Sequence, residues 1–210
     1  MTKTVLLYGD SLFWGLNPAT GKRHEREDRV STQVQAALQQ AEVINEGLRG
    51  RTMFGENGYF PQRDGQDQFG PIFASHLPID LVTIMLGTND LNAKTQHSAE
   101  DIAVSVPRYV EQMQSWCDFM GYPLPKVLVV SPTDIDASSL TKFAEVFAGA
   151  SEKVAPAVAA LEHLSQEQGY EFLDARSVAR SINGDGIHLD PEESRKLGIA
   201  IGEKIAAMLT

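Results

Sequence analysis

Three residues at opposite ends of the chain could together carry out acyl transfer. Ser11 follows the apolar run 4–8 after Gly9 and Asp10, and a serine hydroxyl becomes a nucleophile once a neighbouring base takes its proton. His188 is a candidate base, and Asp185 stands three residues before it. A carboxylate at that spacing can accept from Nδ1 and leave Nε2 free to act on Ser11. Asp-x-x-His also occurs in ordinary turns, so the triad prediction depends on the residues around it.

Two further positions could supply hydrogen-bond donors to the same site. Asn89 belongs to Gly-Thr-Asn-Asp after the apolar run 81–86, and Gly50 ends the segment 45–50. With the Ser11 backbone N–H, the Gly50 N–H and the Asn89 side-chain amide make three donors. Three such donors form an oxyanion hole, which stabilises the tetrahedral intermediate of acyl transfer. Taken singly, Gly50 and Asn89 could each be ordinary turn residues.

Five short apolar runs must position these residues. They cover 4–8, 42–45, 80–86, 126–130 and 170–173, and they are apolar at consecutive rather than alternating positions. That pattern is typical of parallel strands covered by helices on both faces. The sequence therefore predicts an α/β fold with three α/β/α layers, flavodoxin-like, around a parallel sheet of about five strands. Ser11 and Asn89 would then lie at the carboxyl edge, where open α/β sheets bind ligands.

Helical patterns fill the gaps between the strands. Ser98 and Asp101 form a capping-box-like start for an apolar stripe over 102–120, with a possible kink at Pro107. Asp190 as N-cap and Pro191 at the first helical position predict a final helix. The segments 55–71 and 131–150 read as long loops, and such loops often shape binding sites.

The four blocks together resemble the SGNH hydrolases, also called the GDSL esterase/lipase family. The blocks are Gly9-Asp10-Ser11-Leu12, the segment ending at Gly50, Gly87-Thr88-Asn89-Asp90, and Asp185-Gly186-Ile187-His188. The family contributes Ser, Gly, Asn and His from such blocks, each at or just after the carboxyl end of a strand. The resemblance extends over nearly the whole chain and implies one SGNH hydrolase domain over 1–210.

The sequence in and between the blocks resembles the arylesterase/acyltransferase subgroup, which includes a mycobacterial acyltransferase with perhydrolase activity. Segments 9–15, 46–52, 76–90 and 126–132 carry this likeness, whereas 133–150 lacks the proline-rich wall of that subgroup. The subgroup implies a pocket that includes Leu12 and Trp14, and a homo-oligomer as large as an octamer. The aromatic residues of segments 55–71 and 131–150 also favour an oligomer, since a small domain has little reason to expose them.

The predicted activity is that of a serine esterase. Ser11 would attack a short-chain aryl, alkyl or acetylated carbohydrate ester, His188 would act as base and then acid, and Asp185 would orient His188. Water or another alcohol would resolve the acyl-enzyme. No cofactor or metal is required. Two alternatives remain: a non-catalytic flavodoxin-like module that binds a small ligand, and, among enzymes, a thioesterase or carbohydrate deacetylase.

Composition excludes several other classes. The chain has 210 residues and a net charge of −10, so its field repels nucleic acids and anionic membrane surfaces. Its single cysteine, Cys117, allows no intrachain disulfide, and the histidines lack metal-ligand spacing. The N-terminal apolar run is too short for a signal peptide, and no run is long enough to cross a membrane. We therefore expect a cytoplasmic protein whose partner is a small-molecule ester.

Overall fold

Five parallel strands form the centre of the protein. The computed structural model describes residues 2–182 and 184–210. The strands lie in the order β2-β1-β3-β4-β5. Their bounds are β1 Lys3–Gly9, β2 Ala41–Gly47, β3 Leu81–Met85, β4 Lys126–Val130 and β5 Glu171–Leu173. All four pairings are parallel. The predicted five-stranded parallel sheet is confirmed.

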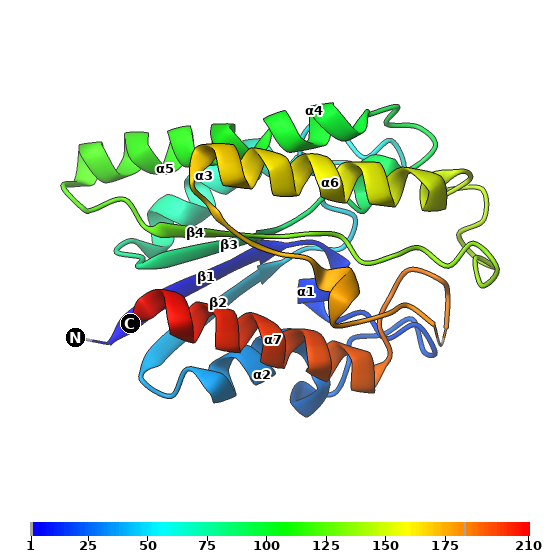
Figure 1. The fold of residues 1–210 in the computed structure, drawn as a ribbon, viewed down its shortest axis with the longest axis horizontal. Helices are drawn as coiled ribbons and strands as arrows, with labels where there is room; N and C mark the ends of the chain where they lie inside the picture. The colour runs from blue at the N-terminus through cyan, green and yellow to red at the C-terminus, as the bar shows by residue number, and fades with distance from the viewer. Residues whose placement is uncertain (1, 183) are drawn as a thin grey trace.

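Helices cover both faces of this sheet (Figure 1). One face carries α3 Gly65–His76, α4 Ala99–Val104, α5 Val106–Met120 and α6 Ala150–Gln168. The other face carries α1 Ser11–Trp14, α2 Val30–Ala37 and α7 Pro191–Leu209. Short 3-10 turns are η1 Arg26–Asp28, η2 Asn89–Leu91 and η3 Ala175–Ser177. The predicted α/β/α layering is therefore confirmed.

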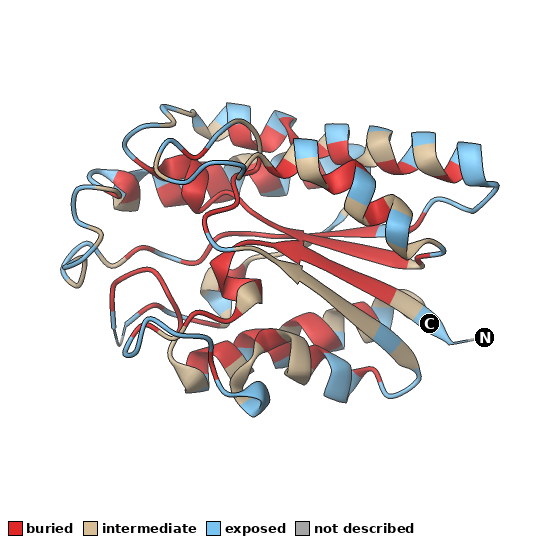
Figure 2. Cartoon of the chain, turned by 180° about the vertical axis from the view of Figure 1, so that it is seen from behind, coloured by how far each residue is buried: buried red, intermediate tan, exposed pale blue. Residues whose placement is uncertain are grey.

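Alternate strand residues feed two hydrophobic cores. Leu6 and Tyr8 of β1 join the core under α3 to α6, while Val5 and Leu7 join the core under α1, α2 and α7. Because both faces of the strand are buried, consecutive apolar residues are needed there. Figure 2 shows this burial along the central strands, in contrast to the partly buried edge strand β2.

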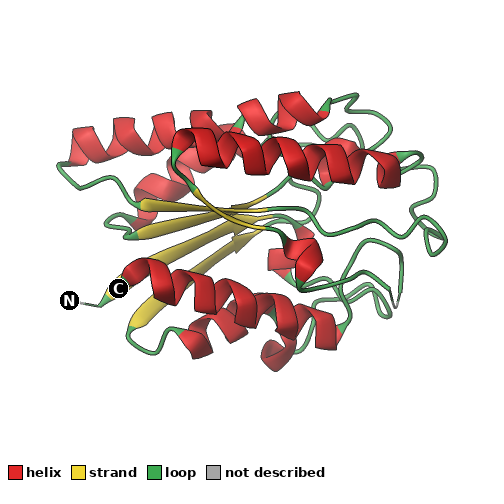
Figure 3. Ribbon diagram, in the orientation of Figure 1, coloured by secondary structure: helices red, strands yellow, loops and turns green. Residues whose placement is uncertain are grey.

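The carboxyl ends of the strands meet at one edge of the sheet. The register pairs Gly9 of β1 with Gly47 of β2 and with Met85 of β3. The strands point toward the end of the molecule where the longest loops lie, away from both chain termini (Figure 3). Segments that follow β1, β2 and β3 are therefore brought together despite their separation in the sequence.

The helix predictions are correct at the C-terminus and wrong in detail elsewhere. Asp190 caps α7, with its side chain accepting from Glu193 N, and Pro191 is the first helical residue. The stripe over 102–120 is not one helix, because the chain breaks at Ser105 and α5 starts afresh with Pro107 in its first turn. The predicted loop 55–71 ends early, because Asp64 caps α3 through the N–H groups of Gln66 and Asp67.

Segments 55–71 and 131–150, both predicted as loops, contribute aromatic side chains to the buried core. Phe69 is fully buried in α3 and Phe147 is 6% exposed, whereas Phe60 is 51% exposed. Most of the aromatic surface that favoured an oligomer is thus covered within the chain itself. Among the described residues, no helix combines the length and apolar character needed to cross a membrane.

Candidate active site

Ser11, His188 and Asp185 form a continuous hydrogen-bonded line. Ser11 Oγ lies 2.9 Å from His188 Nε2, and His188 Nδ1 lies 2.8 Å from Asp185 Oδ2. An ionised carboxylate can only accept, so the proton between Asp185 and His188 sits on Nδ1 and Nε2 is left to accept from Ser11. Each of the three residues is 6% exposed. The structure thus brings together the three residues predicted as a triad.

The local sequence explains why Ser11 faces the site. β1 ends at Gly9 and α1 begins at Ser11, so the chain turns sharply between them. Asp10 is the N-cap, and its Oδ1 accepts from Leu12 N at 2.9 Å. The first turn of α1 is therefore fixed at the carboxyl end of β1, between β2 and β3 in the sheet. Its first residue carries the hydroxyl.

The loop before α7 holds both other members of the line. Asp185 Oδ1 accepts from the backbone N–H of Ile187 at 3.1 Å and of His188 at 2.9 Å. Gly186 has φ +81°, and a Cβ there would lie 2.5 Å from the carbonyl oxygen of Asp136. Only glycine fits this position without a shift. Segment 131–150 thereby packs directly against the loop that presents the imidazole.

The electrostatics of this line suit a base. Burial opposes ionisation of Asp185, but the hydrogen bond and charge of His188 and the N–H groups of His188 and Ile187 outweigh it. They hold the pKa of Asp185 below its ordinary value. Asp185 is therefore ionised at neutral pH, and its charge stabilises the imidazolium that forms when His188 takes a proton.

Two backbone donors beside Ser11 point to an oxyanion hole. Among residues 2–182 and 184–210, neither the Ser11 N–H nor the Gly50 N–H has a hydrogen-bond partner. Gly50 is buried with φ +79°, a left-handed conformation, and its carbonyl accepts from Asn57 Nδ2 at 2.8 Å. Buried N–H groups without partners are rare. These two are available to a ligand oxygen.

Asn89 supplies the side-chain amide of the same region. It begins η2 immediately after the β3 loop and is 8% exposed. Its Nδ2 donates to the Arg51 carbonyl at 3.0 Å and makes a longer 3.4 Å contact with Asp10 Oδ2. The contact at 3.4 Å is longer than a strong hydrogen bond. An oxyanion in the pocket can therefore compete for that hydrogen.

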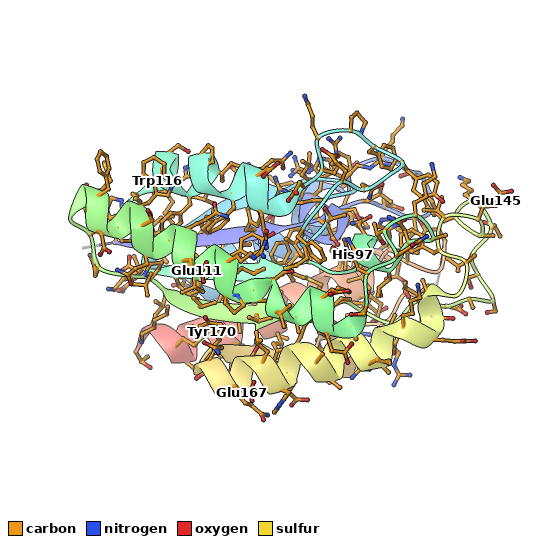
Figure 4. The ribbon with its side chains drawn as sticks, turned by 90° about the horizontal axis from the view of Figure 1, so that it is seen from above. His97, Glu111, Trp116, Glu145, Glu167 and Tyr170 are labelled. Atoms are coloured by element: carbon orange, nitrogen blue, oxygen red, sulfur yellow. The ribbon has the colours of Figure 1, made fainter. Side chains whose placement is uncertain are left out.

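Two buried carboxyl groups, those of Asp10 and Asp90, connect the loops that carry the site. Burial raises the pKa of Asp10 to about 6 and also raises the pKa of Asp90. Asp90 accepts from Met53 N at 2.7 Å and from His97 Nδ1 at 3.2 Å. Figure 4 labels His97, which lies on the segment before α4. Asp90 thus ties the loop after β2 to the loop after β3.

A cavity of about 430 Å³ opens over these groups. Ser11, Gly50, Asn89 and His188 line it together. Its other lining residues come chiefly from segments 49–63 and 143–147: Leu16, Arg49, Asn57, Tyr59, Phe60, Arg63, Phe143, Val146, Phe147 and Ile187. The Phe143 ring lies edge-on to the His188 imidazole, with centroids 5.9 Å apart. The arrangement presents a nucleophile, a base and three donors to one enclosed space, which fits acyl transfer.

The family comparison agrees with this chemistry. The family model for the GDSL-like lipase/acylhydrolase family matches residues 7–195. The chain belongs to this family. No curated protein matches the chain. The identification predicted from the four sequence blocks is confirmed.

Solved structures of similar esterases cover almost the whole chain. A carbohydrate acetylesterase from Sinorhizobium meliloti is 34% identical, with a TM-score of 0.92 over 98% of this chain and 99% of the other. An aryl esterase from M. smegmatis is also 34% identical, with a TM-score of 0.91 over the same shares. These matches confirm the predicted fold and the esterase class.

Two of the predicted pocket residues lie outside the cavity lining in this GDSL-family chain. Leu12 is 4% exposed and packs into the core under α1, α2 and α7, so it does not line the cavity. On the four-residue helix α1, the side chain after the serine points back into that core. Trp14 is half-buried and lies between the guanidinium groups of Arg23 and Arg49, at 5.3 Å from each, outside the cavity lining.

Several functional residues were not predicted from the GDSL blocks. Arg51 is 2% exposed and donates to the carbonyls of Gly9 and Glu46, which joins the ends of β1 and β2. Arg49 and Arg63 line the cavity. The sequence indicated these three arginines only through their position in or beside a GDSL block or a long loop.

The absence of a metal site remains a prediction. Within the described residues, no group of three or more His, Cys, Asp or Glu side chains could hold an ion.

Proposed function

We propose that this ester hydrolase acts on short-chain carboxylic esters through an acyl-enzyme on Ser11. The observation that carries the proposal is the line from Ser11 Oγ through His188 to Asp185, which ends in the same cavity as the two unpartnered N–H groups. Membership of the GDSL-like family and the similarity to esterases support the reaction class. Retention of the whole line argues against a module that only binds ligand.

The geometry allows a two-step reaction. His188 Nε2 takes the Ser11 proton while Oγ attacks the ester carbonyl, and the resulting oxyanion accepts from the Ser11 N–H, the Gly50 N–H and the Asn89 amide. The tetrahedral intermediate collapses when His188 gives its proton to the departing alkoxide. Water then enters, loses a proton to His188 and attacks the acyl carbon; the bond to Ser11 Oγ breaks as His188 returns that proton to Oγ, which releases the carboxylic acid and restores the free enzyme. Another alcohol in place of water would give a new ester.

The shape of the cavity and the relatives support a preference for small acyl groups. A volume of about 430 Å³ is shared between the acyl and alcohol parts of the substrate. Phe143, Val146 and Phe147 close one side of it. The similar S. meliloti protein is a carbohydrate acetylesterase and the M. smegmatis protein an aryl esterase. We infer that acetate and similarly short esters of aryl alcohols or sugars are the substrate class.

Replacement of Ser11 tests the proposal. Ser11→Ala should fold normally and lose hydrolysis of 4-nitrophenyl acetate, because the covalent route needs the hydroxyl. Without the Ser11 hydroxyl, the remaining groups should accelerate hydrolysis by at most roughly 10³ to 10⁴ over the uncatalysed reaction. Ser75→Ala is the matched control, because Ser75 is exposed on α3, lies outside the cavity lining and donates its hydroxyl to the Ile72 carbonyl at 2.8 Å. A serine-directed phosphonate should label wild type and the control but not Ser11→Ala. A folded Ser11→Ala protein with the wild-type rate would disprove the mechanism.

A further inference from the structure

Two arginines share the cavity with the proposed catalytic groups. Arg49 and Arg63 both line it, beside Gly50 and facing the same space as Ser11. The protein carries 28 acidic and 18 basic side chains, so a basic cavity wall is unusual in this chain. Hydrolysis of a neutral ester does not require cationic side chains there, and neither arginine has a role in the reaction described above.

Neither arginine is neutralised by a carboxylate. Within the part of the chain that the structure describes, no Asp or Glu oxygen lies within 4.0 Å of either guanidinium. Other arginines differ: Arg176 pairs with Asp174 at 2.7 Å, and Arg195 pairs with Asp28. The nearby Glu56 carboxylate contacts the backbone N–H of Arg63, at 3.4 Å, and not its side chain. Neither guanidinium therefore has a described carboxylate partner that an anionic ligand would have to displace.

Backbone carbonyls hold the Arg63 guanidinium in place before any ligand arrives, and one aromatic contact orients the exposed Arg49 side chain. Arg63 Nε donates to the Arg49 carbonyl at 2.7 Å, and its Nη1 donates to the carbonyls of Pro61 at 2.9 Å and Gln62 at 3.0 Å. Its Nη2 has no partner among the described residues and can donate to a ligand. Arg49 stacks over the Trp14 ring at 5.3 Å. Ordered donors lose less entropy on binding than free side chains do.

A third cation strengthens the field at this wall. Arg23 stacks on the same Trp14 ring at 5.3 Å and donates from Nε to the Trp14 carbonyl. No described carboxylate pairs with its guanidinium within 4.0 Å either. Like charges gathered without counter-ions raise the local positive potential, and a concave surface focuses that potential on the ligand. The cavity therefore favours an anion although the whole protein is acidic.

We propose that Arg49 and Arg63 form a subsite for a negatively charged group on the alcohol part of the ester, such as a carboxylate. The inference rests on the proposed esterase function. Because the proposed acyl group is short, a charge that reaches Arg49 and Arg63 belongs to the alcohol rather than to the acyl chain. The planar guanidinium fork suits a carboxylate. The preferred substrate class is then short-chain esters of hydroxy acids, including acidic sugars.

A matched pair of substrates tests this subsite. 4-Acetoxybenzoate carries a carboxylate where 4-acetoxybenzamide carries a neutral amide of similar size. The readout is the ratio of kcat/KM for the anionic ester to that for the neutral ester, after subtraction of uncatalysed hydrolysis. Intrinsic differences between the two esters cancel when this ratio is compared between protein variants. Turnover of the neutral ester reports separately on the proposed function.

Arg49→Gln and Arg63→Gln should each lower this ratio by about three- to tenfold, the range for a partly exposed charge pair with hydrogen bonding. Raising the salt concentration should lower the wild-type ratio. Arg108→Gln removes an equal charge from an exposed site on α5 outside the cavity lining and should leave the ratio unchanged. Arg49 donates no side-chain hydrogen bond to a described residue, so Arg49→Gln is the safer test of the two. An unchanged ratio in Arg49→Gln, or an equal fall in Arg108→Gln, would overturn the subsite.

Discussion

Gly50→Ala probes the oxyanion hole without removing any donor. Gly50 has φ +79°, in the left-handed region where an alanine is strained. A Cβ on Gly50 would lie 3.0 Å from Phe60 Cδ2. Phe60 is 51% exposed, so its ring can move aside by the few tenths of an ångström required. The main cost of the substitution is therefore the backbone conformation, and relief of that strain rotates the peptide that carries the Gly50 N–H.

The expected effects on stability and on catalysis can be separated. A left-handed alanine costs about 1–2 kcal/mol in the free energy of unfolding. An oxyanion donor must lie within about 2.7–3.1 Å of the developing charge, and complete loss of one donor lowers kcat by about 10² to 10³. Since the Gly50→Ala variant keeps this N–H in a displaced position, we expect part of that loss, a fall in kcat of about 10- to 100-fold.

Gly121→Ala is the matched control for this experiment. Gly121 ends α5 with φ +74°, and nothing lies within 4 Å of the position that its Cβ would take. It should lose about 1–2 kcal/mol of stability, as Gly50→Ala does, and keep its kcat. Urea unfolding measures the stability of both variants, and hydrolysis of 4-nitrophenyl acetate measures kcat. Equal kcat values for Gly50→Ala and wild type would refute the reasoning that strain at this position displaces an N–H on which the oxyanion depends.

Three further predictions concern Asn89, Asp10 and assembly. Asn89→Ala should lower kcat by about 10² to 10³; a kcat equal to wild type would remove its amide from the mechanism. Burial raises the pKa of Asp10 from 3.8 to about 6, so the folded protein binds this proton more tightly than the unfolded chain. The Asp10 contribution to the free energy of unfolding should therefore be fully present below about pH 4 and fall by about 3 kcal/mol as the pH rises through 6. In urea unfolding, Asp10→Asn should lack this part of the pH dependence, and parallel curves would contradict it. The family resemblance predicts a homo-oligomer, which light scattering checks; a monomer at micromolar concentration would count against it.

The sheet and the catalytic blocks were predictable because their signals are local. Consecutive apolar residues in β1 and β3 require burial on both faces, which only a covered parallel sheet provides. The direction of such strands then fixes which residues meet, since Gly9 pairs with both Gly47 and Met85 at the same edge. Ser11, Gly50 and Asn89 each follow one of these strand ends by a few residues. Short connections leave little freedom in where they lie.

The pocket was less predictable because long segments and side-chain direction shape it. Leu12 is adjacent to Ser11 in the sequence but points to the opposite side, into the core. Proximity in sequence therefore does not place a residue in the cavity. The break at Ser105 and the start of α3 at Gly65 were missed for a related reason. At Ser105 the apolar periodicity continues past the break, and at Asp64 a side-chain cap starts a helix inside a segment whose composition indicates a loop.

The contrast between the sheet with its short connections and the longer segments around the cavity also separates reaction type from substrate choice. The nucleophile and the three donors stand on short connections after β1, β2 and β3, whose geometry the sheet dictates, whereas the base His188 stands on the longer segment between β5 and α7. Arg63 and Phe143 come from longer segments of the cavity wall that the sheet does not fix, and Arg49 stands beside Gly50 just after β2. Segment 131–150 also packs against Gly186 beside the base. A substitution in that segment can therefore alter both the cavity and the position of His188, whereas one at Arg49 alters only the charge that the substrate meets.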